Sequence, residues 1–303
     1  MKNKALAAHG SMFLAEAFWG LMSPITKDAL MHGITGIDLV TYRVCGAAGL
    51  FWVSSLFVRR EHVPVKDIFM FALACIFGLC CNQCLFTIGL TFTSPVNASI
   101  MTTSMPIFAM IFAFLILHEP LSAKKVGGVL IGCMGAVMLV LTSAAAHNAK
   151  VGDIRGDLMI VGAQCSFALY LSLFNSLVKR YHPVTVNKWM FLWASLFITP
   201  FTFSHVSAVD YAALPTKTIW EIVYIVGVGT FFCYLLMMNG QKILRPTVVS
   251  IYNNIQPIVS VIVSIAMGLC IFKITQLLAV ILVFIGVMMV TKSKSKRDLA
   301  QKA

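Results

Sequence analysis

Charged side chains are scarce in this chain of 303 residues, because Lys, Arg, Asp and Glu together make up only 11% of it. A soluble domain usually contains about 25% charged and about 45–50% apolar residues. Here hydrophobic residues reach 59%, and the mean hydropathy is +0.88. So few charges cannot coat a surface that faces water. The shortage excludes an ordinary soluble domain and predicts an integral membrane protein.

Several features that define other protein classes are also missing. The chain has no Gly-x-y period, its Pro and Gly numbers are ordinary, and nine Cys are too few for a disulfide scaffold. It contains no phosphate-binding P-loop, no Gly-rich dinucleotide motif and no residue order typical of a catalytic triad. The scattered His residues lack a metal-ligand spacing. We therefore predict no cofactor and no metal, and neither an enzyme nor an ATP-driven pump.

Long apolar runs, by contrast, follow one another along the chain. A helix needs about 20 mostly apolar residues to cross about 30 Å of hydrocarbon, and the alternating pattern of membrane strands does not occur. The predicted spans are residues 9–31, 38–58, 67–90, 94–117, 124–144, 157–178, 186–204, 218–239, 246–269 and 275–291. The predicted fold is all-α, with ten transmembrane helices. The first run contains Glu16 and Lys27 and nine spans follow it, so we expect a membrane helix there and not a cleavable signal peptide.

The net charge of +12 has two readings, a nucleic-acid partner or a topology signal. If the N-terminus is cytoplasmic, 17 of the 23 basic residues fall in cytoplasmic segments, and only Lys150, Arg155, Lys217 and Lys273 fall on the opposite side. Such a bias is typical of cytoplasmic loops. It predicts a multi-pass protein of the cytoplasmic (inner) membrane with both termini in the cytoplasm, a basic tail at 292–303, and no nucleic-acid partner.

The two halves of the chain resemble each other at an offset of 151 residues. The matched pairs are Gly89 and Gly240, Pro95 and Pro246, Ser99 and Ser250, Ile100 and Ile251, Pro106 and Pro257, and Gly135 and Gly286. The sequence therefore predicts a five-helix repeat at 1–145 and a second at 154–291. Because five is odd, the second repeat enters the membrane from the opposite side, which is the inverted architecture of many secondary transporters.

Several short segments resemble the EamA-type ten-helix permeases of the drug/metabolite transporter superfamily over about residues 9–291. They are Trp19-Gly20, Lys27, Arg43, Gly89 with Thr93-Ser94-Pro95, Pro106, Glu119 with Leu121, Gly156-Asp157, and Phe167-Ala168-Leu169-Tyr170. The resemblance implies ten helices and transport of a small metabolite, with export as the direction. The chain departs from the family at His118-Glu119 and Leu269-Cys270, where Gly-Glu is common, and Asn187 is the rough counterpart of Arg43.

Ionisable side chains inside a span are costly and invite a functional hypothesis. Glu16 lies about 10 Å into the first span, and Trp19, Ser23 and Lys27 follow it on the same helical face. This stripe suits a water-filled pathway, although Glu16 could equally be a buried structural acid. Lys27 and Arg43 lie near span ends, where they could contact substrate or instead snorkel and pair with Asp28 and Asp38.

Amides and hydroxyls gather near two matched prolines, Pro106 and Pro257, which interrupt helices at equivalent places in the two halves. Such interruptions point to a midplane binding site. The candidate site residues are Asn82, Thr102, Thr103, Tyr252, Asn253, Asn254 and Gln256. Gln256 shares a helical face with both Asn253 and Tyr252, so it is the first choice for a substrate hydrogen bond. The alternative is that these groups only join helices to one another.

Two smaller motifs favour packing over chemistry. Cys81-x-x-Cys84 has no His or acid beside it in its span, so small apolar filler is the better interpretation. Gly128-x-x-x-Gly132 allows two helices to approach closely, within the chain or across a dimer.

We therefore expect a secondary transporter for a small metabolite, namely an amino acid or a related compound. The alternatives are a lipid-modifying membrane enzyme, a multidrug exporter and a channel. The expected partners are the substrate and membrane lipid, in a monomer or homodimer.

Overall fold

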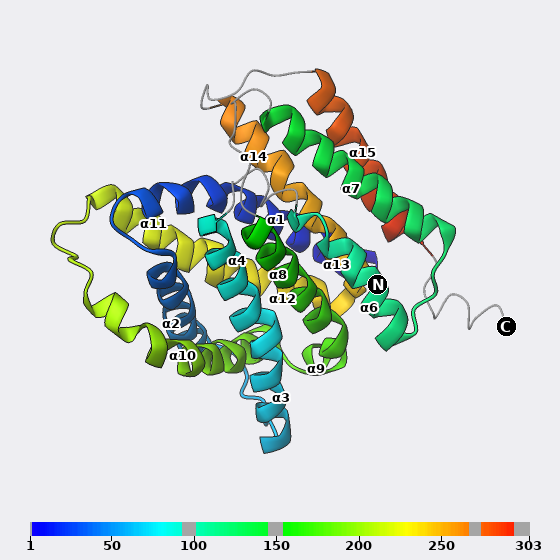
Figure 1. The fold of residues 1–303 in the computed structure, drawn as a ribbon. Coiled ribbons are helices and arrows are strands. Elements are labelled where there is room, and N and C mark those ends of the chain that lie inside the picture. Colours follow the sequence, from blue (N-terminus) through cyan, green and yellow to red (C-terminus); the bar gives the residue numbers. More distant parts are fainter. Residues whose placement is uncertain (1, 93–100, 145–153, 267–273, 294–303) are drawn as a thin grey trace.

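The computed structural model describes residues 2–92, 101–144, 154–266 and 274–293, and within these ranges every regular element is a helix (Figure 1). The first half holds α1 (Lys2–Met31), α2 (Gly36–Ser54), α3 (Val65–Cys75), η1 (Ile76–Cys81), α4 (Asn82–Phe92), α6 (Met105–Leu117) and α7 (Ala123–Ala144). The second half holds α8 (Ile154–Leu173), α9 (Asn175–Arg180), α10 (Pro183–Ser207), α11 (Thr216–Val226), η2 (Gly227–Phe232), α12 (Cys233–Ile243), α13 (Pro246–Ile251), η3 (Tyr252–Asn254), α14 (Ile255–Ala266) and α15 (Ile274–Thr291).

Four helical stretches of the described chain are long and apolar enough to cross a membrane. They are Val65–Phe92, Ile154–Leu173, Pro183–Ser207 and Thr216–Ile243. Each of the other predicted spans also overlaps at least one described helix, but whether all ten cross the bilayer stays a prediction. The described residues therefore form an all-helical fold with apolar spans, as the sequence predicted for a membrane protein.

The helix bounds recur at the same offset of 151 that relates the sequence halves. Adding 151 to the bounds of α3, η1 and α4 gives those of α11, η2 and α12. Both η1 and η2 are π-helical turns, in which one extra residue per turn widens the helix. Two such uncommon turns at matched positions indicate that the halves share their local structure as well as their prolines.

Helices α4 and α12, which occupy equivalent positions in the two halves, each pack against the first helix of the other half. Helix α4 packs on α8 of the other half, and α12 packs on α1. The matched glycines Gly89 and Gly240 lie at these two contacts: a Cβ on Gly89 would lie 2.9 Å from the carbonyl oxygen of Gly156, and one on Gly240 would lie 2.5 Å from Met12. The first helix of each half is therefore part of the packing of the other half.

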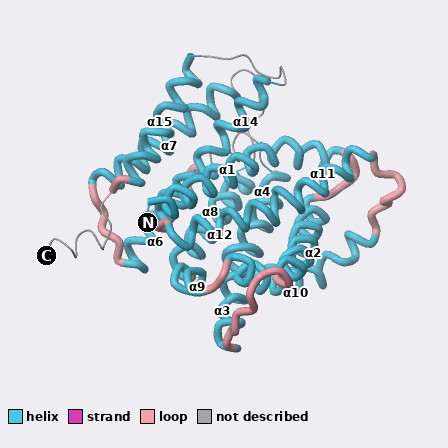
Figure 2. Tube along the Cα trace, turned by 180° about the vertical axis from the view of Figure 1, so that it is seen from behind, coloured by secondary structure: helices cyan, strands magenta, loops and turns pink. Residues whose placement is uncertain are grey.

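Helices α7 and α15 lie side by side along their lengths in both views (Figures 1 and 2). A Cβ on Gly128 would lie 3.0 Å from the carbonyl oxygen of Gly286, and one on Gly135 would lie 2.8 Å from that of Ala279. Backbones approach this closely only where side chains are small. In the described structure, the Gly128-x-x-x-Gly132 motif thus serves an intramolecular contact.

A buried ion pair fixes the connection between α6 and α7. The Lys125 ammonium lies 2.5 Å from the Glu119 carboxylate, and the Lys125 residue is 0% exposed. The turn that precedes Glu119 requires a left-handed backbone at His118, with φ 54°. Glycine adopts this conformation without a Cβ penalty, which accounts for the Gly-Glu sequence common in the resembling permeases.

Replacing His118 with glycine is expected to stabilise the protein. A left-handed L-residue costs about 1–2 kcal/mol, and the greater freedom of glycine in the unfolded chain offsets part of that gain. The melting temperature of His118→Gly in detergent should therefore rise by a few degrees. His118→Ala, which keeps the Cβ, is the control and should show no rise; equal effects of the two variants would contradict the backbone explanation.

Candidate functional site

Two prolines lie at equivalent positions where helices break, and each leaves one backbone carbonyl without its usual donor four residues later. Proline has no N–H to donate to the carbonyl four residues earlier, and its ring clashes with that carbonyl. For Pro106 that carbonyl belongs to Thr102, and the chain turns at Thr103 and Ser104 before α6 begins. For Pro257 it belongs to Asn253, and the chain tightens into the 3-10 turn η3.

Three side chains from the two halves meet at these breaks, in a group that we call the amide cluster: Glu16, Asn253 and Gln256. Asn253 Nδ2 donates to the freed carbonyl oxygen of Thr102 at 3.0 Å. Gln256 Nε2 donates both to Asn253 Oδ1 at 2.8 Å and to Glu16 Oε2 at 2.6 Å. The hydrogen bonds link α1, the Thr102 turn and η3–α14 into one network; a substrate hydrogen bond from Gln256 stays a prediction.

The close approach of α1 to α14 places Glu16 in this network. Gly20, one turn after Glu16, is buried, and a Cβ there would lie 2.7 Å from the carbonyl oxygen of Gln256. Glu16 itself is 3% exposed. A carboxyl group with so little exposure needs hydrogen-bond partners, and the Gln256 amide supplies one.

A second group lies beside the amide cluster. Trp19 of α1 and Arg43 of α2 both contact the π-helical turn η2. Trp19 Nε1 donates to the carbonyl oxygen of Gly229 at 2.8 Å. Arg43 Nε donates to Thr230 Oγ1 at 2.9 Å, which in turn donates to the carbonyl oxygen of Ile225. The Trp19 ring meets that of Tyr234 edge-on, with centroids 5.6 Å apart. We call Trp19, Arg43, Thr230 and Tyr234 the π-turn cluster.

The two clusters are adjacent along α1, because Glu16 and Trp19 lie three residues apart in that helix. An acid and a base are thus held apart on neighbouring elements, each bonded to neutral polar groups.

Three other predicted site residues lie against neighbouring parts of the protein. Tyr252 Oη shares a 2.8 Å hydrogen bond with His9 Nδ1, and Asn82 Nδ2 donates to the carbonyl oxygen of Ala163 at 3.0 Å. Asn254 is fully buried, and its amide lies 3.2 Å from a Cβ built on Gly132. The hydrogen bonds of Tyr252 and Asn82 join helices to one another, while a role of these residues in substrate binding stays a prediction.

The remaining predictions fall around the turn at Thr103 and along α1. Thr103 is buried, and its carbonyl oxygen accepts a bond from Cys133 Sγ at 3.1 Å. The side chains of Ser23 and Lys27 lie outside the described part of the structure.

The suggested pairing of Arg43 with Asp38 is wrong. The Asp38 carboxylate accepts bonds from the Thr35 backbone and hydroxyl at the start of α2, which is a helix cap. Asp28, suggested for Lys27, forms an ion pair with Lys217 at 2.6 Å. Local capping and an ion pair to α11 thus engage both acids.

Sequence reasoning missed the π-turn cluster beyond Trp19 and Arg43. The π-turn itself has no sequence pattern of the kind that caps or prolines provide. The repeat of 151 residues is the signal that could have revealed this turn. Gly78 and Gly229 are 151 residues apart, and so are Gln83 and Tyr234. Gln83 Nε2 donates a hydrogen bond to Tyr234 Oη at 3.3 Å.

Several known proteins are similar to this chain over most of its length. The chain is 27% identical over 278 residues to "Uncharacterized transporter YyaM" of Bacillus subtilis, covering 91% of this chain and 87% of the relative. It is 21% identical to a WAT1-related protein of Arabidopsis thaliana, covering 93% and 83%. A crystal structure 15% identical in sequence superposes with a TM-score of 0.75 and covers 96% of this chain and 97% of its own, which shows the fold. The EamA-like transporter family matches residues 7–141 and again 154–292, and the chain therefore belongs to the EamA-like transporter family.

Proposed function

We propose that this membrane transporter is a secondary permease that moves a small metabolite, such as an amino acid, out across the cytoplasmic membrane by alternating access. In this proposal two inverted five-helix repeats, 1–145 and 154–291, make ten spans with cytoplasmic termini. The repeated family match and the recurrence of helix bounds at an offset of 151 support it. The observation that carries the proposal is the amide cluster, in which broken helices of both halves meet.

The amide cluster is suited to a gate as well as to a binding site. Its bonds cross between the halves through Asn253 and Thr102, which are themselves 151 apart. A contact between equivalent positions lies close to the axis that relates two repeats. When the repeats rock against each other, the side chains at the axis move least, so a site there stays formed while its access changes.

The charges favour a zwitterionic substrate. Glu16 is an acceptor for an ammonium group, and the Arg43 guanidinium is a donor for a carboxylate. Gln256 and Asn253 can exchange their mutual hydrogen bond for bonds to the same substrate. Because Glu16 is nearly inaccessible in this arrangement, a substrate would reach it only when α1 and α14 separate.

A two-part experiment tests the function. Purified protein is first screened with amino acids, nucleosides and cationic drugs for ligands that raise its melting temperature. Protein in liposomes is then assayed for flux of each ligand found. Saturable flux and exchange of an amino acid are expected. Stabilisation by drugs alone would instead favour a multidrug exporter, and chemical conversion of added lipid would favour an enzyme.

The proposed topology predicts where reporters are active. A reporter fused after Ala303 should be active in the form that requires the cytoplasm, and reporters inserted near residues 150 and 210 should be active in the form that requires the outside. The physical reason is the excess of basic residues in the cytoplasmic segments. An external reading for the C-terminal fusion would mean an odd number of spans and no inverted repeat.

A further inference from the structure

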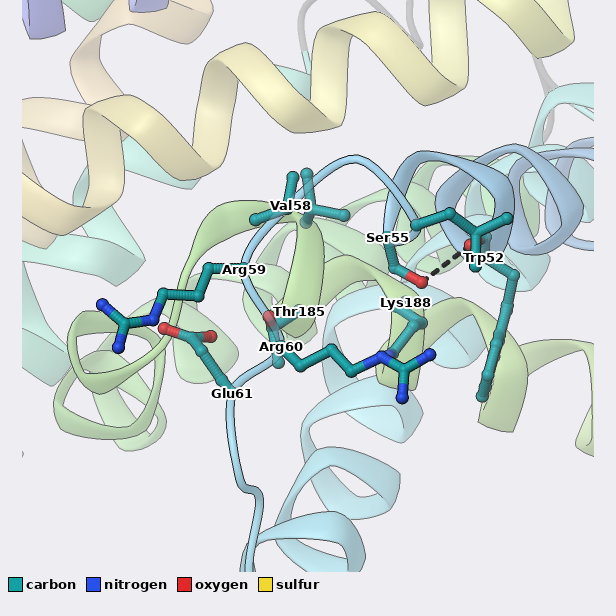
Figure 3. Close-up of a pocket in the computed structure, with 10 residues that line it drawn as sticks. Trp52, Ser55, Val58, Arg59, Arg60, Glu61, Thr185 and Lys188 are labelled. Atoms are coloured by element: carbon teal, nitrogen blue, oxygen red, sulfur yellow. Dashed lines mark hydrogen bonds between the residues drawn. The ribbon is translucent and has the colours of Figure 1, made fainter.

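A basic pocket lies apart from both clusters, where α2 ends and α10 begins. Its wall contains Trp52, Ser55, Arg59, Arg60, Thr185 and Lys188, together with Glu61 and three apolar residues. Figure 3 shows Arg60 and Lys188 on the side of the pocket that faces Trp52, and Arg59 beside Glu61 on the other. The pocket therefore places two basic groups next to an aromatic ring.

The positive charges of this pocket are only partly neutralised by the protein. Within the described residues, no ion pair involves Arg59, Arg60 or Lys188. Glu61 is the acid in the wall, and it accepts a hydrogen bond from the backbone N–H of His182 at 2.8 Å. Three basic groups against one acid leave an excess positive charge that an anion would complement.

The surroundings of the pocket are those of a membrane surface. Leu56 and Phe57, at the end of α2, are 74% and 86% exposed, which in a membrane protein is typical of side chains that face lipid. Trp52 is 40% exposed and meets Trp189 edge-on at 5.8 Å. Lys188 Nζ lies 4.7 Å from the centre of the Trp52 ring. Tryptophans beside basic groups mark the level of the lipid headgroups.

We propose that this pocket binds the phosphodiester headgroup of an anionic phospholipid. Arg60 donates to the phosphate oxygens through its planar guanidinium, and Lys188 supplies a second charge, held over Trp52 by a cation–π contact. The acyl chains lie along the exposed apolar end of α2. The proposal rests on the membrane position of the chain and not on the transported substrate, so it can fail without affecting the proposed permease.

Lipid retention tests the site directly. The full chain and its variants are placed in vesicles of equimolar phosphatidylcholine and phosphatidylglycerol, extracted in mild detergent, and examined by native mass spectrometry for bound phosphatidylglycerol. For the double variant Arg60→Gln/Lys188→Gln we expect about 30-fold weaker retention, which corresponds to about 1 kcal/mol for each basic side chain. Glu61→Gln, which removes the opposing charge, should retain more of this lipid than the unaltered protein.

Two controls separate the pocket from its alternatives. Lys66→Gln removes an exposed charge that lies six residues after Arg60 in sequence and is not part of the pocket wall, and it should retain the lipid normally. Equal loss in Lys66→Gln would mean general surface attraction and would overturn the proposal. Displacement by inorganic phosphate would mean a site for soluble anions and would also overturn it, as would unchanged retention in the double variant. A normal elution volume shows that each variant is folded.

Discussion

Glu16→Gln is expected to weaken substrate binding by at least about 30-fold while the protein folds normally. Glutamine has nearly the same shape and can still accept a bond from Gln256 Nε2, so the network shown by the 2.6 Å contact can persist. What is lost is the charge that would pair with a substrate ammonium. Truncating one member of a buried, hydrogen-bonded charge pair costs about 2–5 kcal/mol. Titration of the melting temperature with the amino acid found in the screen measures the loss.

The amide cluster offers graded controls for this result. Gln256→Ala should weaken binding by about 1.5–3 kcal/mol, because its partner is a charged group, and Asn253→Ala by about 0.5–1.5 kcal/mol. Tyr252→Phe removes a hydroxyl bonded to His9, away from the cluster, and should bind normally. Normal affinity and an unchanged pH profile of transport in Glu16→Gln would leave Glu16 as a structural acid. Normal binding in all the cluster variants would place the site elsewhere.

Lys125→Met should destabilise the protein by about 3–5 kcal/mol, since it leaves the buried Glu119 carboxylate without its partner. The double variant Lys125→Met/Glu119→Leu removes both charges and should recover most of the stability, because replacing a buried pair with apolar groups is often neutral. The free energy of unfolding measured in a denaturant titration tests both. A double variant as unstable as the single one would mean that the side chains matter for packing and not for charge.

Lys217→Met is the matched control for that experiment. Lys217 also forms a 2.6 Å ion pair, with Asp28, but its side chain is 70% exposed. Exposed pairs contribute about 0–1 kcal/mol, so this variant should retain nearly all of its stability. The comparison isolates burial as the cause of the larger effect.

The sequence by itself determined the features that depend on composition, on the length of apolar runs and on the positions of proline. A chain with 11% charged residues cannot face water, and the matched prolines at 106 and 257 favour helix breaks because they lack an N–H. For these reasons the membrane class, the location of the helices and the paired breaks were all available before any coordinates. Glu16 could be singled out because a charge within an apolar run is costly.

Only the tertiary structure decided which groups meet. Nothing in the local sequence distinguishes Gln256, which reaches Glu16, from Asn254, which lies buried against Gly132. The choice depends on how closely α1 approaches α14 at Gly20, and that distance is set by packing between residues 240 positions apart. The same holds for Arg43: an acid five residues away in sequence looked like its partner, but Asp38 caps its own helix and Arg43 bonds to the π-turn of α11–η2–α12. Helix positions follow from each segment alone, whereas side-chain partners follow from the packing of the whole chain.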